Sequence, residues 1–154
     1  MTQENNPPRI SVEAQYIKDL SFENPNAPSS LTGDKKPNID MALDLHVSRL
    51  EKDKDIFEVC LNIQASAKAE NDNLFVVELQ YAGIFTVSGV SDEERKFILG
   101  VHCPALLFPF ARQIISDMTQ SGGFQPLMVD PIDFGALYVS KMQEEAEKSE
   151  EGKK

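Results

Sequence analysis

The sequence has no tryptophan, only two histidines and only two cysteines among its 154 residues. Cys60 and Cys103 do not form a Cys-x-x-Cys pair, and a chain of this length folds without a disulfide, so we expect a reducing environment. The N-terminal segment lacks the cationic stretch and apolar run of a secretory signal. No apolar run approaches the roughly 20 residues that cross a bilayer. These absences predict a cytoplasmic protein.

Positive charge is also scarce. The chain carries 15 Lys and Arg residues against 25 Asp and Glu residues, which gives a formal net charge of −10. Binding to phosphates depends on clustered basic side chains, so nucleic acids and anionic membrane surfaces are poor partners for this chain. The charge favours a basic protein as the partner.

Residues with catalytic chemistry are few. His46 shares a predicted strand face with Asp44, and His102 directly precedes Cys103, but neither pair belongs to a nucleophile or metal-binding motif. The sequence contains no glycine-rich phosphate loop, and Gly122-Gly123 is typical of a helix terminus. We therefore expect no catalytic site, metal or cofactor. A small thioesterase-like enzyme that uses Asp44 or His46 is the alternative from another class.

The composition predicts one folded domain over residues 10–142. Residues 1–9 are polar with two prolines, and residues 143–154 are almost wholly charged or small, so both are predicted to be disordered tails. Up to about Gly89 the domain shows strand patterns, and beyond it helix patterns. Segregated strands and helices are typical of an α+β fold.

Apolar side chains alternate with polar ones in four stretches of the first half, which predicts four strands with one apolar face each. The alternating residues are Ile10, Val12, Ala14, Tyr16, Leu20 and Phe22; Ile39, Met41, Leu43, Leu45 and Val47; Phe57, Val59, Leu61, Ile63, Ala65 and Ala67; and Phe75, Val77, Leu79, Tyr81, Phe85 and Val87. The link over 24–36 is long, whereas those over 51–54 and 70–73 are short and polar. We predict a four-stranded antiparallel meander with helices packed on one face.

The second half carries helix signals. Ser91 and Glu94 have the spacing of a capping box, and Gly100 and Pro104 are expected to interrupt the helix that begins there. A helical pattern over 111–120 stops at the glycine pair. Asp133 is expected to cap a last helix, whose stripe consists of Phe134, Leu137, Tyr138, Lys141 and Met142.

The polar face of the four predicted strands is strongly acidic. It carries Glu13, Asp19, Glu23, Asp40, Asp44, Glu58 and Glu78, with Lys68 as the one cation of the same parity. A solvated sheet surface usually carries charges of both signs. A surface of one sign instead orients a partner of the opposite sign, so this face is a candidate docking surface for a basic protein.

A second candidate is apolar. Phe124, Leu127, Met128 and Val129 lie in a connector between helices, bounded by prolines, where a simple turn would be polar. These residues either close the core over a helix end or line a groove, because aromatic and methionine side chains suit a surface that accepts many sequences.

Four long motifs carry a family resemblance: YIKDLSFENPNAP (residues 16–28), FVVELQYAGIF (75–85), CPALLFPFAR (103–112) and PIDFGAL (131–137). In their order and approximate spacing they resemble the bacterial export chaperone family SecB. Together they extend over nearly the whole predicted domain. One departure is that known members have tryptophan before the PNI motif, where this chain has Lys35 or Lys36.

The resemblance implies a homotetramer, a dimer of dimers, that binds unfolded secretory precursors in apolar grooves and delivers them to the translocation ATPase SecA without nucleotide. It implies SecA binding by Asp19, Glu23, Val76 and Glu78, and binding of unfolded peptides by Phe124, Leu127, Met128 and Val129. It also points to the loop before the second predicted strand as a part of the groove. A related chaperone that serves a toxin-antitoxin pair is the closest alternative.

Overall fold

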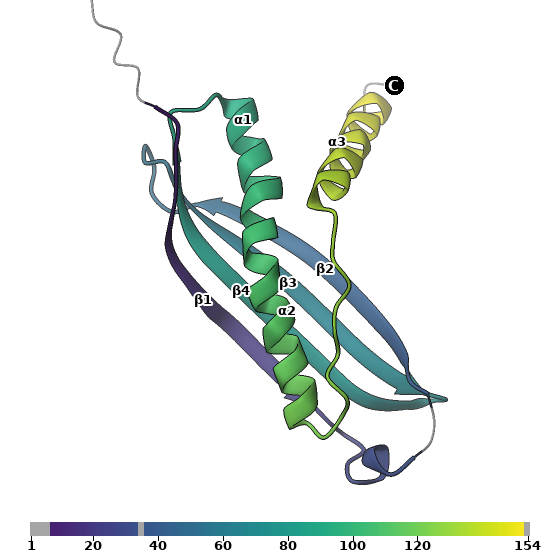
Figure 1. Cartoon of the computed structure of the whole chain (residues 1–154). Helices are drawn as coiled ribbons and strands as arrows, with labels where there is room; N and C mark the ends of the chain where they lie inside the picture. Colours follow the sequence, from purple (N-terminus) through teal and green to yellow (C-terminus); the bar gives the residue numbers. More distant parts are fainter. Residues whose placement is uncertain (1–6, 34–35, 153–154) are drawn as a thin grey trace, which may run out of the picture.

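A computed structural model of the chain describes residues 7–33 and 36–152. Its four-stranded antiparallel sheet consists of β1 (Arg9–Glu23), β2 (Asn38–Arg49), β3 (Ile56–Ala69) and β4 (Asp72–Ser88). The helical part consists of α1 (Asp92–Phe97), the π-helical turn η2 (Ile98–His102), α2 (Cys103–Ser121) and α3 (Phe134–Glu151). Figure 1 shows α1 and α2 as one rod along a single face of the sheet. The predicted α+β class, with helices on one face of an antiparallel sheet, is confirmed.

The predicted meander is wrong in its strand order. The order is β1-β4-β3-β2, so β1 pairs with β4 and the link between β1 and β2 crosses the end of the sheet. That link contains a 3-10 turn, η1 (Ser29–Leu31), and Asn26 Nδ2 donates to the backbone oxygen of Asn73 over 2.7 Å. The short links close the β2–β3 and β3–β4 hairpins, whereas the long link is free to reach the opposite edge. Its length was the signal that the meander interpretation overlooked.

The core lies between the sheet and α2. Successive side chains of a strand point to opposite faces, and the odd-numbered residues of β3 and β4 are buried under the helix. From α2, Leu107, Ala111 and Ile115 are fully buried against them. We call this side of the sheet the helix face and the opposite side the outer face.

Two β-bulges in β1 correct the predicted parity of that strand. The register shifts between Val12 and Ala14 and again between Ile17 and Asp19. Between the bulges Tyr16 lies opposite Ala82 on the outer face, whereas Gln15 turns to the helix face, where it accepts a hydrogen bond from Tyr81 Oη over 3.1 Å. The assignment of Ala14 and Tyr16 to the apolar face was therefore wrong. Each bulge adds one residue, so the second restores the parity that the first removed.

The predicted interruption near Gly100 and Pro104 takes the form of the π-helical turn η2, which separates α1 from α2. The chain does not leave the helical path there, so the run from Asp92 to Ser121 continues as one rod. The cap is as predicted, because Ser91 Oγ accepts the Glu94 N–H over 3.2 Å. By length and composition this run is the one helix of the described residues that could span a membrane, but 44% of its most apolar window is buried in the protein. A core helix passes the same test.

Helix α3 begins as predicted, with Asp133 Oδ1 accepting the Ala136 N–H over 3.0 Å. It continues to Glu151, so the described part of the predicted C-terminal tail is helical where disorder was expected. Extending a capped helix through alanine, glutamate and lysine costs little free energy even without burial, because these residues favour the helix. Residues 1–6 of the predicted N-terminal tail lie outside the described residues, and β1 already begins at Arg9.

Candidate functional site: an acidic sheet face and an apolar groove

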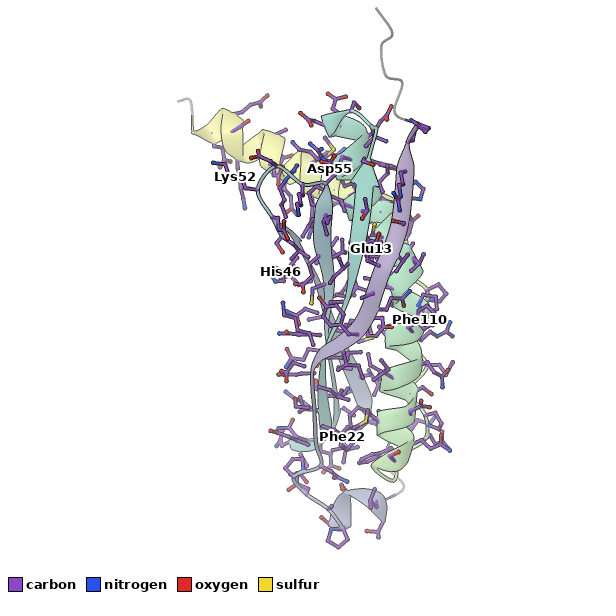
Figure 2. All side chains as sticks on the ribbon, turned by 90° about the vertical axis from the view of Figure 1, so that its left-hand side faces the viewer. Glu13, Phe22, His46, Lys52, Asp55 and Phe110 are labelled. Atoms are coloured by element: carbon purple, nitrogen blue, oxygen red, sulfur yellow. The ribbon has the colours of Figure 1, made fainter. Side chains whose placement is uncertain are left out.

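The acidic side chains gather on the outer face, as the alternation predicted. They come from all four strands: Glu13, Asp19 and Glu23 from β1, Asp40 and Asp44 from β2, Glu58 from β3 and Glu78 from β4. Figure 2 views the sheet from its β1 edge, with His46 of β2 on the side opposite α2 and Phe110 on α2 itself. We call this set of seven carboxylates the acidic face.

The four positions that the family resemblance assigned to SecA lie together on the two neighbouring strands β1 and β4. Glu23 lies opposite Val76, and Ser21 and Asp19 lie opposite Glu78 and Gln80. Asp19, Glu23 and Glu78 are exposed, and Val76 is half-buried. The prediction that these positions share one surface is confirmed, and their role in binding stays a prediction.

The acidic face is hollowed at its centre. A depression of about 280 Å³ is lined by the carboxylates Asp19, Asp44 and Glu78 and by the amides of Asn62, Gln64 and Gln80. Carboxylate and amide oxygens accept hydrogen bonds from ammonium and guanidinium groups. The depression can therefore take a basic side chain of a partner.

Lys68 is not the one cation on this face, because the bulge at Lys18 turns that residue outward as well. Lys18 Nζ lies 2.7 Å from Glu58 Oε1, and Tyr16 Oη also donates to Glu58. The hydrogen bonds from Lys18 and Tyr16 lower the pKa of Glu58. Burial, followed by the bond to Glu58, raises the pKa of Tyr16 to about 12. Glu58 is thus paired within the chain. In the depression, Asp19 and Glu78 face solvent, whereas Asp44 also lies 4.0 Å from Lys141 Nζ of α3.

Replacing Glu58 by glutamine is expected to lower the melting temperature at neutral pH, because Lys18 loses its carboxylate partner. The pKa of Glu58 in the folded chain lies below its usual value of 4.5, so the stabilisation is complete above that value and is lost as the pH falls through the lowered pKa. Melting curves of both proteins from about pH 7 to about pH 3 should converge. A difference that stays constant with pH would contradict this interaction.

An apolar groove lies at the end of the molecule where the β1–β2 link meets the connector over residues 122–133. Its volume is about 580 Å³. The apolar lining consists of Leu31, Ile39, Leu74, Phe75, Phe124 and Leu127. Leu31 and Ile39 expose 45% and 40% of their surface, so the groove offers apolar area to a ligand. Lys36 also lines it, in the segment where known SecB members have tryptophan, and Lys35 lies outside the described residues.

The groove contains two of the four predicted peptide-binding residues. Phe124 packs on the Phe75 ring with centroids 5.0 Å apart, and Leu127 lines the cavity beside it. Val129 is 1% exposed and closes the core, whereas Met128 is 54% exposed and does not line the groove. The loop before the second strand, which the family resemblance also pointed to, contributes Leu31 and Lys36 to the lining. Sequence reasoning missed Ile39 and Leu74, because only the packing of the strand ends against the link and the connector brings them to the groove.

A band of exposed apolar side chains lies beside the covered core. It consists of Ile10, Val12 and Ile17 of β1 with Leu106 and Phe110 of α2. Phe110 stacks on Tyr81 with ring centroids 6.3 Å apart. Exposed apolar surface of this kind makes the band a candidate contact with another protein.

The two candidate catalytic pairs differ in their surroundings. His46 Nε2 lies 3.2 Å from Asp44 Oδ2, but both side chains are more than 60% exposed on the outer face. Cys103 is buried at 2% exposure, and this burial raises its pKa to about 12, so its thiol stays protonated at neutral pH. Within the described residues no group of three or more His, Cys, Asp or Glu side chains could hold a metal ion.

Comparison with known proteins gives one consistent result. The model of the family "Preprotein translocase subunit SecB" matches residues 3–145. The protein-export proteins SecB of Rickettsia akari and Rickettsia typhi are each 56% identical over 138 residues, which span 89% of this chain and 90% of theirs. A SecB-like chaperone of Mycobacterium tuberculosis, solved with a peptide of the HigA1 antitoxin, matches with a TM-score of 0.66 at 13% identity, over 80% of this chain and 91% of that one. The last match shows the fold.

Proposed function

The chain belongs to the SecB family of protein-export chaperones, and on this premise we propose that it binds unfolded precursors in the cytosol, keeps them competent for translocation and delivers them to SecA. The single observation that carries the proposal is the separation of two surfaces of different chemistry. An apolar groove opens beside the connector, and an acidic depression lies on the outer face of the sheet. One molecule can therefore hold a client and a motor at the same time.

The groove accounts for client binding without a sequence motif. Its wall is apolar and aromatic, and such side chains adapt to many client sequences. Ile39 lines it from β2, which is an edge strand of the sheet. The free edge of such a strand can pair with an extended polypeptide through main-chain hydrogen bonds. Affinity then comes from many weak contacts, and no nucleotide is needed.

The acidic face accounts for delivery. Glu23 lies opposite Val76, and Glu78 and Asp19 follow along the same two paired strands, which combines charge with a small apolar contact. A basic segment of SecA is attracted by the three carboxylates and inserts one cationic side chain into the depression. The interaction is electrostatic, so it should weaken as the salt concentration rises.

The exposed apolar band supports self-association. Ile10, Val12 and Ile17 expose between 41% and 52% of their surface, at a sheet edge that is also free to pair. A second copy that covers β1 would bury these apolar side chains and pair the free strand edge. The homotetramer, a dimer of dimers, is the assembly that we propose for the chain in solution.

Native mass spectrometry with and without an unfolded precursor tests assembly and client binding together. We expect tetramers alone in the absence of client, and tetramers that carry a client when a slow-folding precursor is added from denaturant. The same precursor after complete folding is the control and should not bind, because its apolar segments are buried. A monomer that binds neither form would refute the proposed function.

A chaperone dedicated to a toxin-antitoxin pair is the second candidate, supported by the peptide-bound M. tuberculosis structure. At 13% identity that structure supports the fold and leaves the choice of client open. A pull-down from the native host distinguishes the two candidates. A range of secretory precursors is the expected result, whereas a single antitoxin would favour the second.

A further inference from the structure

Two hydroxyl side chains lie inside the apolar core. Among the described residues, Ser116 and Thr119 are the buried polar ones, with 6% and 0% of their surface exposed. Both belong to the last turns of α2. A buried hydroxyl is costly unless it is hydrogen-bonded, so the partners of these two groups indicate what they do.

Thr119 is bonded to the connector in two ways. Its Oγ1 accepts the backbone N–H of Leu127 over 2.9 Å, and its backbone oxygen accepts the N–H of Phe124 over 3.1 Å. The hydroxyl hydrogen is directed back to the helix, where the backbone oxygens of Ile115 and Ser116 each lie 3.0 Å away. Because the hydroxyl donates its hydrogen to the helix, its orientation is fixed. A lone pair of Oγ1 then points to the connector and accepts the Leu127 N–H.

The two amides that Thr119 holds belong to the groove. Phe124 and Leu127 are the connector's aromatic and aliphatic lining residues. Ser116 adds a weaker contact, from its Oγ to Met128 Sδ over 3.5 Å. Within the part of the chain that the structure describes, no backbone amide of residues 125–132 donates to a backbone carbonyl. Regular backbone hydrogen bonds of these residues therefore do not hold the connector against α2.

We propose that Thr119 is the positioning residue of the client groove: its hydroxyl and carbonyl hold the connector where Phe124 and Leu127 form the wall. This inference rests on the proposed function and goes beyond it, because Thr119 is fully buried and acts through the two residues that it holds. A groove with a fixed wall binds a flexible client without first having to order its own backbone.

The test compares Thr119→Val with Thr119→Ser in the full-length protein. Valine keeps the branched shape and removes the hydroxyl, whereas serine keeps the hydroxyl and removes a methyl group. Thr86→Val is the matched control, since Thr86 Oγ1 bonds to Glu13 on the outer face, away from the groove. Hydrogen exchange of the Leu127 amide reports the anchor directly, and the affinity for a reduced, alkylated polypeptide that cannot fold reports the groove.

In Thr119→Val we expect the Leu127 amide to exchange about tenfold faster and client affinity to fall about five- to tenfold, because the amide loses its acceptor. Thr119→Ser and Thr86→Val should keep both values near those of the wild type. Unchanged Leu127 exchange, faster exchange with unchanged client affinity, or failure of serine to restore the values would each overturn the proposal. An equal loss of affinity in Thr86→Val would overturn it too.

Should Thr119→Val fail to assemble, Thr119→Ala replaces it. Alanine suits a helix and also removes the hydroxyl that accepts the Leu127 N–H, so we expect the Leu127 amide to exchange faster and client affinity to fall about five- to tenfold. Unchanged exchange or unchanged affinity in this variant would then overturn the proposal, and so would a Leu127 amide that exchanges in the wild type as fast as in an unfolded peptide. Wild-type protein that protects the Leu127 amide but binds no unfolded polypeptide would instead refute the proposed function and leave the anchor in place.

Discussion

Charge reversal of Glu78 to lysine is expected to weaken SecA binding by at least about 100-fold while client affinity stays at the wild-type value. Glu78 lies in the wall of the acidic depression, next to Asp19 and opposite Ser21 on the paired strand. Lysine removes one attraction and adds a repulsion at the point where a cationic side chain of the motor would insert. Titration calorimetry with SecA and with an unfolded polypeptide measures both affinities.

The matched control for this variant is Glu93→Lys, which changes the net charge by the same amount. Glu93 is exposed in the first turn of α1, on the other side of the sheet. If SecA binds the acidic face, the SecA affinity of Glu93→Lys should stay close to the wild-type value at physiological salt, because charges farther apart than about 8 Å are largely screened. Equal losses in both variants would show that net charge alone attracts SecA, and wild-type SecA affinity in Glu78→Lys would refute the docking surface.

Replacement of Ile39 by aspartate is expected to have the reciprocal effect, a fall in client affinity of about 30-fold or more with SecA binding intact. Ile39 lines the apolar groove from the edge strand β2 and is 40% exposed without a client. Its side chain lies opposite Ala67 on the helix face. A carboxylate there would have to be buried without a partner whenever a client occupies the groove.

The conservative variant Ile39→Val serves as the control, because it keeps the branched apolar character and should bind clients within about twofold of the wild type. Client affinity of Ile39→Asp equal to that of the wild type would place the binding surface elsewhere. The two charged variants also control each other, since each changes one face of the sheet. Loss of both activities in either variant would indicate damage to the fold or to the assembly.

The opposite placement of the two surfaces has a mechanistic consequence. Residues 39 and 40 are neighbours in β2, yet Ile39 lines the groove and Asp40 belongs to the acidic face. A client on one side therefore does not cover the carboxylates on the other. In the proposed function, a client and SecA can therefore bind in either order, which suits a chaperone that must hold a chain until transfer begins.

Much of this arrangement could be predicted from the residues alone. Alternation along β2, β3 and β4 placed their carboxylates on one face because side-chain direction in a strand is a local property of the backbone. The helix starts were readable for the same reason, since Ser91 and Asp133 act within one turn of the chain. Family motifs over nearly the whole domain then indicated the export function.

Other features required the tertiary structure. The bulges of β1 are defined only by its pairing with β4. They turn Tyr16 and Lys18 onto the outer face, where both contact Glu58. The strand order depended on which edge the long link reaches. The groove combines residues from the link, two strands and the connector, and its wall is held by a threonine whose partner is eight positions away.

By itself, the sequence determined the family, the class of fold and the negative charge of one side of the sheet, because each can be read from motifs and alternations that are local in the chain. The tertiary structure alone decided which side chains meet across the bulges, where the groove lies and what anchors it. Those features are set by contacts between segments distant in the chain, and the free energy of such contacts depends on positions that exist only once the sheet and the helices have packed.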